Sequence, residues 1–266
     1  MNLKERMSGR LPEECLALLS NRIHIIGNVA IIRLSPDLEP YKKEIGQDVL
    51  SNGPGIHTVL NKSSNLQGER RVAQYEVLAG RGETVTIHRE FGFTYRLDLS
   101  RVFFSSRLGY ERMRVAEQVR AGEDILLTFA GVGPFAVPLA ARGARVLAVE
   151  KSREACLYLA ENNRRNRVED LVSIINGDAF GSARFIRGRF SRAVIPAPYG
   201  AEGALEAVMP LVRSGGRLHF YAFKKHHEIE PLTRRYERLG LEVLLCRRCG
   251  NVAPRVSRWV FDLAKE

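Results

Sequence analysis

The sequence has few of the features that mark secreted, membrane or disulfide-rich proteins. Its 266 residues include only four cysteines, too few at this length for a disulfide framework. No apolar run approaches the ~18–20 residues that a membrane-spanning helix needs, so we expect no membrane partner. The opening Met-Asn-Leu-Lys-Glu-Arg has no apolar core of a secretory signal. We therefore expect a cytoplasmic location.

The metal and phosphate motifs are incomplete or missing as well. Cys246-Arg-Arg-Cys249 is a lone CxxC without the second pair or the histidines of a zinc site, and we expect no bound metal. No GK[ST] follows any glycine-rich turn, which excludes a P-loop for a triphosphate. Basic residues outnumber acidic ones, 41 to 30, which gives a net charge of +11. Of the basic residues, 33 are arginines and 8 are lysines. This bias fits a polyanionic partner, although a genome that favours arginine would produce the same composition.

The most informative stretch begins with a strand, a glycine turn and a helix. Residues 125–129 form a short apolar run typical of a buried strand, and residues 135–141 fit a short helix. Between them lies Ala130-Gly131-Val132-Gly133-Pro134. Glycines at such a junction allow the backbone to approach a ligand closely, and the helix that follows presents unpaired N–H groups.

Two acids follow at the ends of the next apolar runs. Glu150 lies about twenty residues beyond the first glycine, where nucleotide-binding folds place an acid on the ribose hydroxyls. Asp178 ends the run after that, where it can reach an adenine amino group. Because the glycines stop at Gly133, and the motif that starts at Phe129 is F-A-G-x-G, S-adenosylmethionine fits better than NAD. A turn that binds nothing would explain the glycines but not the two acids.

The chain divides into segments of different character. Residues 1–20 are expected to be helical around 12–19 or loosely attached. Residues 21–100 read as a small α+β domain with an antiparallel sheet, which opens with a hairpin across Gly27-Asn28. In residues 101–266, strands alternate with helices until two final adjacent strands. This pattern predicts an α/β, Rossmann-like class I transferase domain, with a seven-stranded, mostly parallel sheet and an antiparallel hairpin at one edge.

Three charged residues form a further pattern near the start of the second predicted domain. Arg107, Glu111 and Arg114 are spaced i, i+4 and i+7, so they share one face of a turn that leads into a helix. An exposed, salt-bridged surface would have the same spacing. The spacing alone therefore leaves open whether these residues belong to a site.

Several motifs taken together resemble one family. They are Ile45-Gly46, Gly68-Glu-Arg-Arg71, Arg96-Leu-Asp98, Phe104-Ser-Ser-Arg107-Leu-x-x-Glu111-Arg, Phe129-Ala-Gly-Val-Gly-Pro-Phe135 and Asn176-Gly-Asp178. The sequence resembles the archaeal and eukaryotic tRNA (guanine-37) N1-methyltransferases and their relatives, the wyosine-pathway aminocarboxypropyl transferases. The resemblance covers roughly residues 11–263.

The resemblance implies a cofactor, a partner and roles for three residues. The family binds S-adenosylmethionine and modifies the guanosine next to the anticodon, so tRNA, through its anticodon loop, is the expected partner of a monomer. Guanine N1 carries a proton that a base must remove, and the charge on O6 needs a cation. By resemblance, Glu111 matches the base, Arg71 the arginine at O6, and Arg107 an arginine of the methyltransferase branch.

Two departures from the family pattern keep alternatives open. Leu127 stands where family members usually have Asp. Pro196 stands at the Asn of an Asn-Pro motif, a position expected to help hold the cofactor. We expect methylation of guanosine 37, with aminocarboxypropyl transfer to the wyosine precursor as the alternative. A catalytically silent tRNA-binding relative and a small-molecule methyltransferase are the remaining hypotheses.

Overall fold

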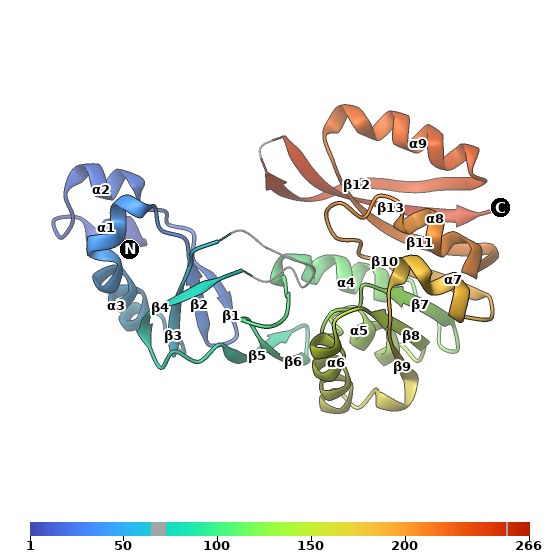
Figure 1. Cartoon of the computed structure of the whole chain (residues 1–266), viewed down its shortest axis with the longest axis horizontal. Coiled ribbons are helices and arrows are strands. Elements are labelled where there is room, and N and C mark those ends of the chain that lie inside the picture. Colours follow the sequence, from blue (N-terminus) through green and yellow to red (C-terminus); the bar gives the residue numbers. More distant parts are fainter. Residues whose placement is uncertain (65–72, 254) are drawn as a thin grey trace. The chain divides into compact units, whose positions relative to one another are not determined.

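The computed structural model describes residues 1–64, 73–253 and 255–266 (Figure 1). The chain forms two compact units. The first contains Met1–Glu90 and Thr94–Phe104, and the second contains Phe91–Phe93 and Ser105–Glu266. Domain boundaries after residues 20 and 100 remain a prediction, and each unit is described below by itself.

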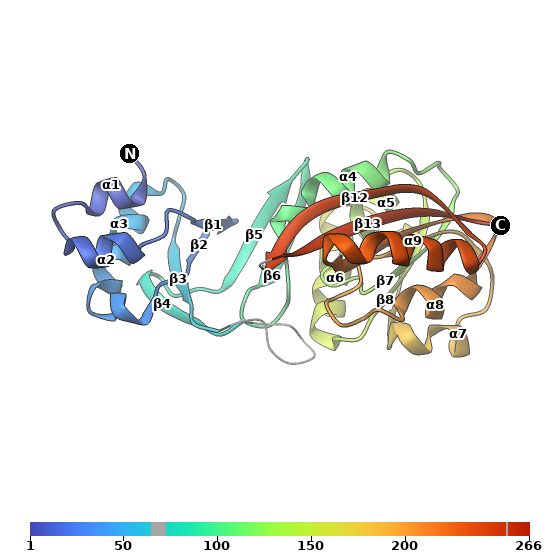
Figure 2. The same cartoon turned by 90° about the horizontal axis from the view of Figure 1, so that it is seen from above.

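The first unit is built on a four-stranded sheet with the order β1-β2-β3-β4. Its elements up to β4 are α1 (Leu3–Met7), α2 (Glu13–Leu18), β1 (His24–Ile26), β2 (Val29–Ile32), η1 (Pro36–Tyr41), α3 (Lys42–Asn52), β3 (Thr58–Lys62) and β4 (Tyr75–Gly80). The three helices lie together on one side of the sheet (Figures 1 and 2). There Met7 and Leu19 share a buried core with Ile45 and Val59. The N-terminal segment is therefore packed onto the sheet and not loosely attached.

The pairing of this sheet differs in one place from the prediction. The hairpin of β1 and β2 across Gly27-Asn28 is present. However, β2 and β3 run parallel, with Val29 beside Thr58, so the expectation of an antiparallel sheet is wrong at this pair. Parallel neighbours need a crossover connection, and η1 followed by α3 supplies it.

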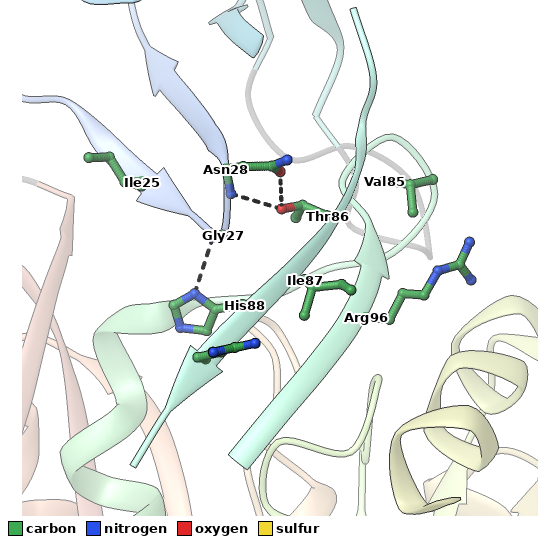
Figure 3. A pocket seen from close by; sticks show the side chains of 9 residues that line it. Ile25, Gly27, Asn28, Val85, Thr86, Ile87, His88 and Arg96 are labelled. Carbon is green, nitrogen blue, oxygen red and sulfur yellow. Dashed lines mark hydrogen bonds between the residues drawn. The ribbon is translucent and has the colours of Figure 1, made fainter. Parts of the chain in front are cut away.

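A two-stranded sheet of β5 (Val85–Glu90) and β6 (Phe93–Asp98) follows. The β1–β2 turn lies against β5, because the Asn28 amide donates to Thr86 Oγ1 at 3.1 Å and the Gly27 amide donates to His88 Nδ1 at 3.3 Å (Figure 3). A Cβ atom at position 27 would lie 2.1 Å from Thr86 Oγ1. Glycine is therefore required where the turn meets β5.

The second unit alternates strands and helices. Its elements are η2 (Ser106–Leu108), α4 (Gly109–Ala116), β7 (Asp124–Thr128), α5 (Ala136–Ala141), β8 (Arg145–Glu150), α6 (Arg153–Arg165), η3 (Glu169–Leu171), β9 (Val172–Asn176), η4 (Ala179–Gly181), α7 (Ser182–Phe185), β10 (Phe190–Ile195), α8 (Ala204–Val208), η5 (Met209–Leu211), β11 (Val212–Lys224), η6 (His226–Glu228), α9 (Ile229–Arg238), β12 (Leu241–Ala253) and β13 (Val256–Lys265).

These strands form a seven-stranded sheet with the order β12-β13-β11-β10-β7-β8-β9. The strands from β11 to β9 are parallel, whereas β13 is antiparallel to both β11 and β12. The β12–β13 hairpin lies at one edge of the sheet, with α9 running beside it (Figures 1 and 2). The predicted α/β, Rossmann-like fold, with a seven-stranded, mostly parallel sheet and an antiparallel hairpin at one edge, is confirmed.

One face of this sheet packs against α8 and α9. Leu126 and Leu218 of the strands share a buried cluster with Leu205 of α8 and Tyr236 of α9. The intervening Leu127 is also fully buried, so β7 is covered on both sides, as a central parallel strand requires. Because both faces of such a strand are covered, only the residues at its end remain accessible to a ligand. The carboxyl ends of the parallel strands are therefore where a ligand is expected to bind.

No helix among the described residues is long and apolar enough to cross a membrane.

Candidate functional site

The glycine turn after β7 has the backbone geometry of a ligand-binding loop. Gly131 and Gly133 have φ values of 57° and 92°, and Phe129 has a φ of 52°, which is unusual for a residue with a side chain. A Cβ atom on Gly131 would meet nothing within 4 Å, whereas one on Gly133 would lie 2.4 Å from Leu159 Cδ1 of α6. Gly131 thus leaves open space beside the backbone, and Gly133 allows α6 to pack closely.

Glu150, the last residue of β8, is fixed by this loop. One of its oxygens accepts the Gly131 amide at 2.8 Å, and the other accepts the Ser152 amide at 2.8 Å. Each carboxylate oxygen retains acceptor capacity for a further hydrogen bond. The half-buried carboxylate is therefore held beside the open space at Gly131, where it could accept the two hydroxyls of a ribose.

Asp178 lies at the end of the next strand, β9. Its Oδ1 accepts the amide of Phe180 at 3.0 Å, and its Oδ2 lies 3.4 Å from Lys151 Nζ. The side chain is 48 % exposed. The exposed ring of Phe180 packs edge-on against Phe129, with 6.1 Å between the ring centroids. Two aromatic rings and an accessible acid at one strand edge suit a purine. Phe180 belongs to none of the sequence motifs, so no local pattern pointed to it.

The two departures noted in the sequence lie in different environments. Leu127 is fully buried inside β7, between Ala148 of β8 and Val194 of β10. Pro196 follows β10 and is half-buried at the same edge as Glu150 and the glycine loop. Pro196 can pack against a ligand there, but it lacks the amide group with which Asn would donate a hydrogen bond.

Glu111 of α4 is the most deeply buried of the predicted catalytic residues that the structure describes. It is 3 % exposed. Its Oε2 accepts Arg114 Nε at 3.0 Å and the Tyr221 hydroxyl at 3.2 Å, and its Oε1 accepts a hydrogen bond from Arg247. Tyr221 in turn packs on Phe135, with 5.6 Å between the ring centroids. Phe135 follows the glycine loop directly, so Glu111 is connected to that loop through two aromatic side chains.

A chain of buried charges continues behind Glu111. Arg114 donates to Asp262 at 3.0 Å, and Asp262 Oδ1 lies 2.7 Å from His219 Nδ1. His219 Nε2 lies 2.7 Å from Arg192, which is paired with Glu123 at 2.9 Å. Arginine can only donate, so His219 Nε2 must accept and Nδ1–H must donate to Asp262. His219 is thus the neutral tautomer that carries its proton on Nδ1.

The pKa shifts of these buried residues agree with the neutral state of His219 and with the donors and acceptors described above. Burial lowers the pKa of His219, and this effect outweighs the opposing hydrogen bond to Asp262. Burial alone would raise the pKa of Asp262, but the hydrogen bonds from His219 and Arg114 outweigh it and hold that pKa well below its usual range. Burial, together with the nearby Glu111 carboxylate, raises the pKa of Tyr221 far above its usual value, so its hydroxyl remains a donor.

The two other predicted catalytic residues are Arg107 and Arg71. Arg107 lies in η2 and is exposed, and the described contacts pair Glu111 with Arg114 and not with Arg107. Arg71 lies outside the described residues. No local sequence pattern pointed to Arg247, which is 136 residues away from Glu111.

The cysteines do not gather with other ligands. Burial raises the pKa of Cys246 to about 11 and that of Cys249 to about 12, so both thiols stay protonated at neutral pH. In the part of the chain that the structure describes, no group of three or more His, Cys, Asp or Glu residues is arranged to hold a metal ion.

The first unit contains a pocket of its own. It has a volume of about 650 Å³ and lies between the β1–β2 turn and the β5–β6 pair (Figure 3). His88, Arg89 and Arg96 are among the residues that line it. Three nitrogen-rich side chains around one pocket suit an anionic ligand.

Comparison with known proteins identifies two matching family profiles. Residues 86–244 match the TRM5/TYW2 methyltransferase domain, and residues 3–84 match the TYW2 N-terminal domain. The chain is 35 % identical over 259 residues to the tRNA (guanine(37)-N(1))-methyltransferase Trm5b of Pyrococcus abyssi, an alignment that covers 95 % of this chain and 77 % of the relative. It is 40 % identical over 177 residues to the tRNA(Phe) (4-demethylwyosine(37)-C(7)) aminocarboxypropyltransferase of Pyrococcus horikoshii, which covers 66 % of this chain and 63 % of the relative.

Solved structures of Trm5 and TYW2 proteins are also similar to this chain. A complex of aTrm5 with tRNALeu has a TM-score of 0.90 at 28 % identity, over 100 % of this chain and 78 % of that one. TYW2 of P. horikoshii in complex with MeSAdo has a TM-score of 0.79 at 30 % identity, over 98 % of this chain and 97 % of that one.

Proposed function

The chain belongs to the TRM5/TYW2 methyltransferase family, and we propose that it uses S-adenosylmethionine to methylate N1 of guanosine 37 in tRNA. One observation carries this proposal. The buried carboxylate of Glu111 is connected through Tyr221 and Phe135 to the glycine loop that would hold the cofactor. A base and a methyl donor must be close to each other for transfer to a protonated ring nitrogen.

The residues at the strand ends fit S-adenosylmethionine. Glu150 would bind the ribose hydroxyls, Asp178 the adenine amino group, and Phe129 with Phe180 would pack on the adenine. The open space at Gly131 would allow the backbone to contact the cofactor directly. Pro196 would close the same edge. When bound, the cofactor supplies an electrophilic methyl group on its sulfur.

Glu111 would act as the general base. Three donors fix its carboxylate, and of these Arg247 is the accessible one, with a side chain 39 % exposed against 13 % for Arg114. The side of the carboxylate that Arg247 covers therefore leads to solvent. Guanine N1–H would donate to Glu111 from that side and pass its proton to the carboxylate as the methyl group is transferred.

The charge that develops on guanine O6 needs a cation. By resemblance to the family we assign that role to Arg71, and we place Arg107 beside the reacting base. Arg107 is exposed four residues before Glu111, so its side chain is available to a substrate. The pocket of the first unit, with Arg89 and Arg96, would bind RNA phosphates near the anticodon loop.

A second candidate function is aminocarboxypropyl transfer to the wyosine precursor at the same tRNA position. The match of residues 3–84 to the TYW2 N-terminal domain favours it. Pro196 favours it as well, because the Asn expected of a methyltransferase is absent there. The two reactions use the same cofactor and differ in the carbon that is attacked, the methyl carbon or the γ-carbon of the methionine part.

The decisive experiment uses two labelled cofactors in parallel, one with a labelled methyl group and one with a labelled carboxyl carbon. Each is incubated with the protein and with tRNA that carries guanosine, N1-methylguanosine or the tricyclic wyosine precursor at position 37. Methyl label on guanosine tRNA is the expected result. Carboxyl label on the tricyclic base would establish the second candidate, and no transfer despite cofactor binding would overturn both.

We also propose that the protein works as a cytoplasmic monomer without a metal ion. The resemblance to tRNA-modifying enzymes and the lone Cys246-Arg-Arg-Cys249 support this proposal. Light scattering at working concentration should give the mass of one chain, 29.9 kDa. Activity should survive treatment with a chelator.

A further inference from the structure

The second unit contains a cationic pocket that is lined by none of the proposed catalytic residues. It has a volume of about 590 Å³ and lies at the tip of the β12–β13 hairpin, next to η6. We call it the hairpin pocket. Its lining residues are Lys225, His226, His227, Arg248, Asn251, Ala253, Arg255, Ser257 and Trp259.

The charges of the hairpin pocket all have one sign. Lys225, Arg248 and Arg255 are permanent cations at neutral pH, and none of the lining residues is acidic. The ion pairs found among the described residues include none of these three cations. Like charges gathered around one hollow repel each other, and an anionic ligand would relieve that repulsion.

The pocket also offers a flat apolar surface. Trp259 is half-buried there, held by a hydrogen bond from its Nε1 to the Lys224 carbonyl at 3.2 Å and by an edge contact with the His226 ring at 5.8 Å. Asn251 and Ser257 lie beside it and hydrogen-bond each other at 3.0 Å. An indole next to cations and neutral polar groups is the combination that binds a nucleotide, with its base stacked and its phosphate paired.

The hairpin also reaches the catalytic centre. Arg247 and Arg248 are neighbours on β12, and successive side chains of a strand point to opposite faces. Arg247 accordingly extends to Glu111, whereas Arg248 lines the hairpin pocket beside its cross-strand partner Trp259. The pocket also adjoins the carboxyl end of β11, the edge of the parallel sheet where the glycine loop lies.

From this geometry we propose that the hairpin pocket binds a single-stranded nucleotide of the RNA substrate other than the one that reacts. Its phosphate pairs with Lys225, Arg248 and Arg255, and its base stacks on Trp259. This inference rests on the proposed function, because it takes tRNA as the substrate. It assigns the tip of the β12–β13 hairpin to RNA binding, apart from the site of group transfer.

The test uses the fact that Trp259 is the single tryptophan of the chain. Its fluorescence is followed while tRNA is added, and tRNA binding is measured independently by filter retention at several salt concentrations. Stacking of a base on the indole should quench the emission with the same dissociation constant as binding. Saturating tRNA that binds but leaves the emission unchanged would overturn the stacking of a base on Trp259.

The pairing of the phosphate with the cations of the hairpin pocket is tested with the double variant Arg248→Ala/Arg255→Ala. The matched control is Arg142→Ala/Arg164→Ala, which removes two exposed arginines at the C-terminal ends of α5 and α6. We expect at least tenfold weaker tRNA binding for the pocket variant. The slope of its salt dependence should also fall, by up to about 0.7, since about 0.7 is lost per phosphate contact on single strands.

The outcomes separate this inference from the proposed function. The pocket variant should keep the cofactor affinity of the wild type, because its two residues do not belong to the glycine loop that would hold the cofactor. If the wild type transfers its group but the pocket and control variants bind tRNA equally well, the hairpin pocket is not an RNA site and the proposed function stands. If the wild type neither binds nor modifies tRNA, both proposals fail.

Discussion

Arg247 and Glu111 form an ion pair between β12 and α4, across 136 residues of sequence. Glu111 is almost fully buried, whereas the Arg247 side chain is 39 % exposed and also lies over the ring of Tyr110, 5.2 Å from its centroid. The buried partners Arg114 and Tyr221 hold the other oxygen of the carboxylate. This arrangement fixes the proposed base on its inner side and covers it with a partly exposed cation on its outer side.

Replacing Arg247 with alanine should lower kcat about tenfold, because the carboxylate of Glu111 loses one of the three contacts that orient it. Folding stability should change little, since the side chain is half-exposed. Steady-state kinetics with saturating cofactor and tRNA, together with a thermal melt, measures both. A rise in kcat would contradict the orienting role and would identify Arg247 as a cover that the substrate must displace.

Replacing Glu111 with glutamine should lower turnover by roughly 10²–10⁴, because the amide cannot accept the N1 proton. The cofactor does not contact this side chain in our assignment, so its dissociation constant should stay within about twofold. The exposed Glu117 at the end of the same helix, changed to glutamine, is the control and should be fully active. Unchanged turnover of the Glu111 variant would remove this residue from the mechanism.

The two loop glycines should respond differently to alanine. Gly131→Ala places a methyl group in the open space where the cofactor is expected and should weaken cofactor binding at least tenfold. Gly133→Ala forces its Cβ against Leu159 and should mainly reduce the free energy of unfolding, by about 1–3 kcal/mol. Calorimetric titration and urea unfolding of both variants separate the effects. Equal cofactor affinity for Gly131→Ala and the wild type would show that the cofactor does not approach this position.

Replacing Glu150 with alanine should weaken cofactor binding about 10- to 100-fold. The change removes the acceptor for the ribose hydroxyls, and the amides of Gly131 and Ser152 lose their partner. Glu169→Ala, an exposed acid of the same unit, is the control. An unaltered dissociation constant for Glu150→Ala would argue against the ribose assignment.

The stability of the second unit should depend on pH through His219. Burial holds the pKa of this residue in the folded state below its ordinary value of about 6.5. Below that pH the unfolded chain takes up a proton that the folded chain does not. The free energy of unfolding should therefore fall as the pH decreases from 6.5, by up to about 1.4 kcal/mol per pH unit for this one group.

Urea unfolding between pH 8 and pH 5 measures this dependence. Replacing His219 with glutamine should lower stability at pH 8, because its bonds to Asp262 and Arg192 are disturbed, and should flatten the dependence below pH 6.5. The exposed His227, changed to glutamine, should keep the slope of the wild type. If both variants keep that slope, His219 is not the buried neutral group described here.

Local patterns in the sequence were sufficient for most of the fold. Apolar runs of strand length, separated by glycine turns and helical segments, predicted the seven-stranded sheet and its antiparallel hairpin. They could do so because a short continuous apolar run by itself indicates a buried strand. The same patterns predicted a glycine turn at Gly131 and Gly133 and strand ends near Glu150 and Asp178, since such features are visible in a short window. The binding roles of these four residues stay a prediction. The parallel pairing of β2 with β3 was missed, because pairing direction depends on which distant strands meet.

The surroundings of Glu111 were decided by the tertiary structure alone. From its spacing, Glu111 could equally have belonged to an exposed, salt-bridged surface. The fold buries it instead, and its contacts come from Tyr221 on β11 and Arg247 on β12, with Asp262 on β13 behind them. These three residues follow Glu111 by more than a hundred positions, and no local pattern links them to it. A strand pattern determines that a segment is buried, whereas the packing of the whole sheet determines which charges meet in its interior.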